Sequence, residues 1–127
     1  MNATLVSDVC FDELGHVVRG RFVLLLVYDE RMAGSDYLLR LAERVARRLE
    51  PTFIVATVKR SCIDERYRAL LGNPPRMVML YNGSKVWEQV GFFYSSVADT
   101  KALARGILYA LRRLSFTPSQ LGIRLDF

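Results

Sequence analysis

The sequence predicts an α/β fold, with one mixed central sheet and helices on both of its faces. Two runs, "FVLLLVY" and "TFIVATV", are apolar almost throughout, which is typical of strands that are covered on both faces. The segments around them repeat their apolar residues with helical spacing. Farther along, Asn82-Gly83 separates two strand-like segments and is a favoured turn of a β-hairpin. Strands connected through helices, followed by a hairpin and a covering helix, give this architecture.

Length and composition favour a single folded domain. The chain has 127 residues, 51% of them hydrophobic, and no apolar run reaches the roughly 18–20 residues that span a bilayer. The opening stretch, "MNATLVSDVC", lacks the basic start and apolar block of a secretion signal, so we expect a cytoplasmic protein with no membrane partner. The net charge of +5 is compatible with nucleic-acid binding but does not by itself indicate it.

The first predicted elements lead to the central strand. Residues 2–6 are a candidate edge strand, and Ser7 is placed to cap a helix that ends at Gly20. Arg21–Tyr28 then forms the central strand, which is apolar on both of its faces.

A polar loop, residues 29–34, follows the central strand and leads into an amphipathic helix. We expect Ser35 to be the N-cap of this helix, because a hydroxyl there accepts a hydrogen bond from a free backbone amide. The helix runs to about Leu49 and stops before Pro51.

The second half of the predicted domain contains two helices and a hairpin. Residues 52–59 are rich in β-branched side chains and predict another strand. A short helix is expected at residues 63–71, with Gly72 as its stop. The hairpin occupies residues 76–92, and a long helix covers about Val97–Leu114. The domain therefore comprises residues 1–114.

Residues 115–127 form a C-terminal extension of this domain. Apolar and polar residues alternate in it, and a period of two predicts an extra strand with one buried face. Three arrangements satisfy the pattern: pairing with a sheet edge of the same chain, pairing with a neighbouring copy in a homodimer, or loose packing over the core. The alternating apolar residues are Leu121, Ile123, Leu125 and Phe127.

The segment "PPRMVMLYNG" resembles the thioredoxin family, and the likeness extends over roughly residues 5–114. Thioredoxins have a proline at this place, followed by a hydrophobic strand and an Asn-Gly turn. The resemblance implies a thioredoxin-like fold and a cis peptide bond between Pro74 and Pro75. The "VGF" of Val90–Phe92 is similar to the Val-Gly segment beside the family's substrate groove.

The same resemblance indicates that the redox apparatus is missing. It places the family's Cys-x-x-Cys on Met32–Ser35, its buried acid on Leu26, the neighbouring lysine near Ala56 and the preceding tryptophan near Tyr28. Disulfide exchange needs a thiolate to attack and a second thiol to resolve the mixed disulfide. We therefore expect no dithiol oxidoreductase activity, and we do not expect an enzyme.

Two cysteines and one histidine provide few other reactive groups. Cys62 follows Lys59 and Arg60, and this basic setting favours a thiolate, so a single-cysteine redox or regulatory role is one alternative. The other interpretation is a small, partly buried apolar residue. Cys10 is interpreted as a packing residue inside the first helix, and His16 as a residue at its end. These residues are too few for a closed zinc site, and we expect no metal or other cofactor.

Two further groups of charged residues are interpreted as solvated. Asp29 and Glu30 are adjacent carboxylates in a polar turn, and no nucleophile beside them is identifiable. Basic residues occur on two helices, which we expect to cover opposite faces of the sheet. That placement would divide the charge, so a basic nucleic-acid-associated domain is a less favoured alternative. The basic residues are Arg40, Arg44, Arg47, Arg48, Lys101, Arg105, Arg112 and Arg113.

The resemblance also suggests where a partner would bind. Without its cysteines, the family groove would leave a shallow, partly apolar surface, and methionine and aromatic residues suit adaptable contacts with another protein or peptide. The sequence thus predicts a redox-inactive protein-interaction or chaperone-like accessory module. The candidate groove residues are Arg31, Met32, Ala33, Pro74, Pro75, Gly91 and Phe92.

Overall fold

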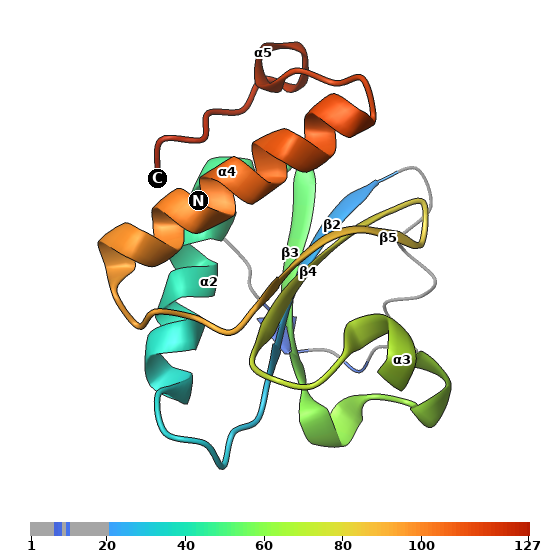
Figure 1. Cartoon of the computed structure of the whole chain (residues 1–127), viewed down its shortest axis with the longest axis vertical. Helices are drawn as coiled ribbons and strands as arrows, with labels where there is room; N and C mark the ends of the chain where they lie inside the picture. Colours follow the sequence, from blue (N-terminus) through green and yellow to red (C-terminus); the bar gives the residue numbers. More distant parts are fainter. Residues whose placement is uncertain (1–6, 9, 11–20) are drawn as a thin grey trace.

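The computed structural model of the chain describes residues 7–8, 10 and 21–127 and shows an α/β fold built on one mixed sheet (Figure 1). Among these residues the sheet has five strands in the order β1-β3-β2-β4-β5. Strand β3 is parallel to both β1 and β2, whereas β4 is antiparallel to β2 and β5. The strands are β1 (Ser7–Asp8), β2 (Phe22–Tyr28), β3 (Phe53–Lys59), β4 (Arg76–Tyr81) and β5 (Ser84–Val90).

The central strand β2 separates two apolar cores. All seven of its residues are buried, as its continuous apolar sequence predicts. Leu24 and Leu26 belong to the larger core, and Val23, Leu25 and Val27 belong to the smaller core on the opposite face of the sheet. Every second residue thus faces the same layer, which gives β2 no solvent-facing side.

Two long helices pack on the same face of the sheet (Figure 1). Helix α2 (Ser35–Leu49) contributes Leu41 to the larger core, and helix α4 (Ser96–Arg113) contributes Ile107 to it. The expectation that these helices lie on opposite faces is therefore wrong. No helix among the described residues is both long and apolar enough to cross a membrane.

Short helical turns cover the other face. The helix predicted at residues 63–71 is divided into η2 (Glu65–Tyr67) and α3 (Arg68–Leu71), which Gly72 ends. A further turn, η1 (Arg60–Cys62), precedes the predicted span. Ile63 and Leu71 from this region enter the smaller core. Helices on both faces of the sheet are thus confirmed, although they are distributed differently from the expectation.

The predicted hairpin is confirmed. Asn82 and Gly83 connect β4 to β5, and both have positive φ angles, of 53° and 79°, as a primed hairpin turn requires. Helix α4 packs closely on this hairpin: a Cβ atom at Gly106 would collide with the indole ring of Trp87 on β5. Glycine at this position allows the helix and the strand to approach each other.

The N-terminal segment differs from the prediction where it is described. Ser7 belongs to strand β1, where it pairs with Ala56 of β3, and it does not cap a helix. Pairing along the free edge of β3 has overridden the local capping signal. The predicted edge strand at residues 2–6 and the helix with His16 lie outside the described residues.

The C-terminal extension forms a helical turn instead of the expected strand. Helix α5 (Pro118–Leu121) has a capping box between Thr117 and Gln120, and Gly122 follows it in a left-handed conformation. Ile123 is buried, with 6% of its surface exposed, and Leu121, Leu125 and Phe127 pack against the larger core. The capping box favours a helical turn over the predicted strand, and after this turn the C-terminal residues pack on their own domain.

A disulfide joins the segment after β1 to the segment after β3. Cys10 is bonded to Cys62, with their Cα atoms 4.8 Å apart, so Cys10 is neither helical nor a packing residue. Cys62 is likewise not a lone thiol. The parallel pairing of β1 with β3 brings the residues that follow these strands to the same edge of the sheet, and this explains how cysteines 52 residues apart meet.

This disulfide predicts a measurable loss of stability on its removal. In the chain-entropy treatment, opening a loop of 52 residues costs roughly 4 kcal/mol of unfolding free energy. Replacing Cys10 and Cys62 by serine should therefore lower the unfolding free energy by about 2–4 kcal/mol in denaturant titrations. A reducing agent should produce a similar loss in the native chain and none in the double variant. Free thiols at both cysteines in unreduced, denatured protein would contradict the bond.

Candidate functional site

The loop between β2 and α2 contains the residues on which the sequence resemblance places the family's Cys-x-x-Cys. Met32 and Ala33 are exposed, with 45% of the Met32 surface open to solvent. Gly34 occupies the N-cap position of α2 in a left-handed conformation, with φ 90°, and no side chain caps the helix. Ser35 is the first helical residue, so its predicted N-cap role is wrong; the backbone turn at Gly34 begins the helix instead.

The proline loop lies against the end of β5. The peptide bond between Pro74 and Pro75 is cis, as the resemblance implies. The backbone N–H of Gly91 donates a hydrogen bond to the Pro75 carbonyl, with an N···O distance of 3.1 Å. Phe92 is half-buried and packs against the larger core. The structure therefore brings the predicted residues Pro75, Gly91 and Phe92 into one region.

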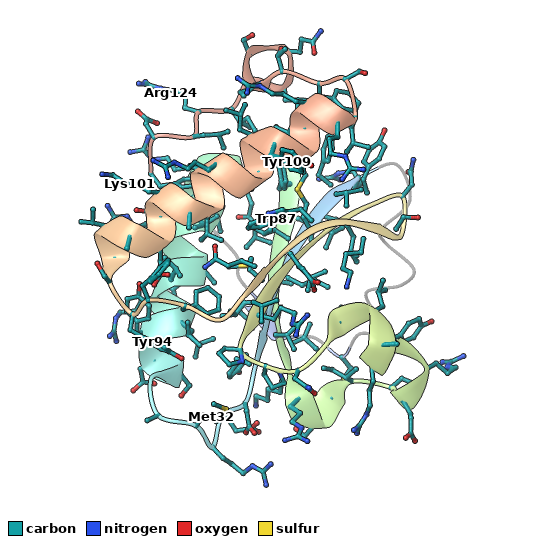
Figure 2. All side chains as sticks on the ribbon, in the orientation of Figure 1. Met32, Trp87, Tyr94, Lys101, Tyr109 and Arg124 are labelled. Atoms are coloured by element: carbon teal, nitrogen blue, oxygen red, sulfur yellow. A yellow bond between two sulfur atoms is a disulfide. The ribbon has the colours of Figure 1, made fainter. Side chains whose placement is uncertain are left out.

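Tyr94 connects this region to the loop before α2. A Cβ atom added to Gly34 would lie 2.7 Å from the Tyr94 ring, so only glycine permits this close approach. The Tyr94 ring also contacts Tyr37 of α2, with 5.5 Å between ring centroids. Figure 2 shows Tyr94 and Met32 at the same end of the molecule. Two loops that are more than fifty residues apart in the sequence thus form one surface.

Asp99, a residue that the sequence analysis did not single out, organises this surface. It is fully buried in the first turn of α4. One carboxylate oxygen accepts a hydrogen bond from the Phe93 backbone N–H at 2.9 Å, and the other accepts from the Tyr94 N–H at 3.0 Å and the Tyr37 hydroxyl at 2.6 Å. Burial, followed by the hydrogen bond to this carboxylate, raises the pKa of Tyr37. An acidic residue in the first turn of a helix is usually explained by a favourable interaction with the helix dipole. The sequence position of Asp99 therefore does not indicate that it holds the Phe93–Tyr94 backbone.

Most of the exposed large apolar side chains lie in the two segments that the Asp99 network and the Tyr94–Gly34 contact bring together. The described residues include six exposed large apolar side chains, and five of them lie in the loop before α2 or between the end of β5 and the start of α4. Phe93 is the most exposed, at 70%, while its backbone is fixed by Asp99. We call this set the apolar patch: Met32, Val90, Phe93, Tyr94 and Val97.

A polar pocket adjoins the other side of the same loop. Asp29 is only 7% exposed, so its expected solvated position is wrong. Its carboxylate accepts hydrogen bonds from the backbone N–H and the Nε of Arg31, and lies 3.8 Å from Nη1 of Arg60. The hydrogen bond from the Arg31 backbone, followed by that from its side chain, lowers the pKa of Asp29. Asp29 therefore organises two arginines.

The two positions that the resemblance assigns to the family's proton-handling pair are apolar. Leu26 and Ala56 are both buried on the neighbouring strands β2 and β3, but they are not partners in the sheet, since Leu26 pairs with Thr57. Leu26 belongs to the larger core and Ala56 to the smaller one. Neither side chain can carry a proton. Among the described residues, no group of three or more His, Cys, Asp or Glu is arranged to hold a metal ion.

The two basic helices lie on one layer of the protein. Because α2 and α4 share a core, their outward-facing arginines and lysine lie on the same side of the sheet, contrary to the expectation. Arg44 of α2 donates a hydrogen bond to Ser96 of α4, which joins the two helices at this surface. We call this set the basic face: Arg40, Arg44, Arg47, Arg48, Lys101 and Arg105.

Comparison with solved structures confirms the thioredoxin-like fold. Thioredoxin from Malassezia sympodialis superimposes with a TM-score of 0.68 at 14% identity, covering 84% of this chain and 94% of that chain. Thioredoxin from Trypanosoma brucei brucei gives 0.64 at 15% identity, covering 89% and 93% respectively. A chain from the complex of ferredoxin:thioredoxin reductase with thioredoxin f2 gives 0.64 at 16%, covering 84% and 100%. At such identities the similarity shows the fold alone. No protein-family model and no curated protein matches the sequence.

The Asp99 network predicts a large effect from one substitution. Asp99→Ala would leave the amides of Phe93 and Tyr94 and the Tyr37 hydroxyl without their acceptor, and we expect it to lower the unfolding free energy by about 3–5 kcal/mol. Tyr37→Phe, which removes one hydrogen bond, should cost about 1 kcal/mol in the same denaturant titration. Asp36→Ala, an exposed acid in the first turn of α2, is the control and should change stability by less than about 0.5 kcal/mol. Equal effects of Asp99→Ala and Asp36→Ala would contradict the network.

Proposed function

We propose that the protein is a redox-inactive member of the thioredoxin-like fold that binds another protein through the apolar patch. The observation that carries the proposal is the concentration of five of the six exposed large apolar side chains around the loop before α2 and the β5–α4 connection. Concentrated apolar exposure of this kind marks interaction surfaces more often than scattered single residues do.

The chemistry of the patch supports binding to a protein segment. Phe93 and Tyr94 provide aromatic contact area on a backbone that Asp99 holds in place, so little backbone entropy is lost on binding. Met32 adds an unbranched side chain that adapts to different partners. A rigid aromatic pair beside an adaptable methionine suits exposed apolar segments, including those of incompletely folded chains.

The sequence around the patch supports the redox-inactive part of the proposal. Met32–Ser35 provides no thiol where the family has its Cys-x-x-Cys, and Leu26 provides no acid beneath it. The two cysteines of the chain are bonded to each other beyond the end of β3 instead. Thiol exchange at the patch therefore lacks an attacking group.

A permanently unfolded polypeptide tests this function. Reduced, carboxymethylated lactalbumin, carrying a fluorescent label, should bind to the protein in anisotropy titrations. Replacing Phe93 and Met32 together by aspartate should weaken this binding by about ten- to hundredfold, because each substitution removes apolar contact area and introduces a charge that must be desolvated.

Tyr109→Asp is the matched control, because Tyr109 is also an exposed aromatic residue but lies in the second half of α4 (Figure 2). It should leave the affinity within about twofold. Equal losses in both variants, or an unchanged affinity in the Phe93 and Met32 variant, would show that the patch is not the binding surface. Catalytic reduction of insulin by the native protein would contradict the redox-inactive part.

A second candidate function, nucleic-acid association, is favoured by the basic face. Because α2 and α4 pack on the same face of the sheet, the charges of the basic face are not divided between opposite faces. Glu43 on α2 and Asp126, which pairs with Arg48, reduce the net positive charge of the face. Phosphate contacts by arginine and lysine give binding that weakens as the salt concentration rises.

Charge reversal separates this candidate from general basicity. If nucleic acid binds here, Arg47→Glu and Lys101→Glu should each weaken binding to a labelled DNA duplex. Each should also reduce, by about one, the magnitude of the slope of the logarithm of the binding constant against the logarithm of the salt concentration. Arg66→Glu makes the same charge change on η2, away from the basic face, and should have a smaller effect. Equal effects of all three substitutions, measured by anisotropy at several salt concentrations, would reject the basic face as a specific site.

A further inference from the structure

A polar pocket with a cavity volume of about 390 Å³ lies beside the apolar patch but is separate from it. It is placed beyond the carboxyl ends of β2 and β3, which are parallel neighbours in the sheet. Open α/β sheets bind their ligands in the crevice at the carboxyl ends of such strands. The pocket is lined by Asp29, Glu30, Arg31, Arg60, Ser61 and Arg68.

Three arginines from separate segments meet in this pocket. Arg31 comes from the loop after β2, Arg60 from η1 after β3, and Arg68 from the start of α3. Asp29, buried at the end of β2, binds Arg31 through one carboxylate oxygen and approaches Arg60 with the other. Each guanidinium has five N–H donors, so both arginines retain donors for a ligand.

Arg68 adds a third guanidinium group and lines two cavities. It lines the polar pocket together with Arg60, and the same two arginines line a smaller cavity of about 40 Å³ that extends to Asn73 and Pro74. Ser61 adds a hydroxyl to the larger pocket. The disulfide at Cys62, the last residue of η1, ties the segment that carries Arg60 and Ser61 to the residues after β1.

We propose that this pocket binds the phosphate group of a small phosphorylated molecule. Guanidinium groups bind phosphate oxygens through paired N–H donors, and three of them around one cavity suit a tetrahedral oxyanion better than a single planar carboxylate. The volume exceeds that of phosphate alone and lies within the range of small-molecule sites, so room remains for the body of the ligand. Asp29 holds the arginines in position, whereas Glu30 opposes the anion and sets the affinity.

The test is a titration with inorganic phosphate at constant ionic strength. Binding is measured by calorimetry and by the shifts of backbone amide signals in NMR spectra. We expect saturable binding that moves the amide signals of Arg31 and Ser61. Arg68→Ala should weaken phosphate binding by about tenfold or more, because it removes charged hydrogen bonds. Glu30→Gln should tighten it by roughly two- to fivefold, because it removes the repelling charge.

Arg124→Ala is the matched control, since it removes the same charge from an exposed residue of the C-terminal segment that lines neither the pocket nor the basic face. It should leave phosphate affinity within about twofold. The proposal is overturned if phosphate shows no saturable binding, if Arg124→Ala weakens it as much as Arg68→Ala, or if Glu30→Gln fails to tighten it. Thermal melts of the variants establish that each is folded. None of these substitutions touches the apolar patch, so the result is independent of protein binding.

Discussion

The candidate surface depends on one buried carboxylate. Asp99 satisfies two backbone amides and one phenol at once, and it does so from the first turn of a helix whose other residues anchor it in the larger core. A buried charge without hydrogen-bond partners would be strongly destabilising. The three hydrogen bonds therefore stabilise the buried carboxylate, and the carboxylate in turn fixes the backbone of the loop. The result is that Phe93 can be mostly exposed on a fixed backbone, which a free loop would not provide. Asp99 thus provides local rigidity beneath an exposed apolar side chain.

The features that the sequence could predict are those determined by neighbouring residues. The seven buried residues of β2 follow from a continuous apolar run, and the turn at Asn82-Gly83 follows from the tolerance of these residues for positive φ. The cis bond at Pro74–Pro75 could be predicted only from the resemblance, because few X–Pro bonds are cis and local sequence does not indicate which ones. Each of these signals lies within about ten residues of sequence. Together they were enough to predict the thioredoxin-like fold.

The features that the sequence could not predict depend on contacts between distant segments. In the sequence, Asp99 is an ordinary acidic residue in the first turn of a helix. Its role becomes visible only because the fold places Tyr37, 62 residues away, beside it. The bond between Cys10 and Cys62 requires β1 to pair with β3, whereas capping chemistry favoured a helix at Ser7. In the C-terminal extension, the Thr117 capping box outweighed the alternating pattern. Local propensity is a weak prior, and in each case tertiary contact or a stronger local cap decided the outcome.

The loop after β2 serves two surfaces because its residues are held differently. Asp29 is buried and fixes Arg31 in the polar pocket, whereas Met32, the next residue, belongs to the apolar patch. The turn is closed by the hydrogen bond from the Met32 N–H to the Asp29 carbonyl, which fixes the backbone from which both side chains extend. A ligand in the pocket and a protein on the patch would therefore contact adjacent residues of one short, fixed turn. The loop that lines the polar pocket thus also exposes apolar surface, within the four residues from Asp29 to Met32.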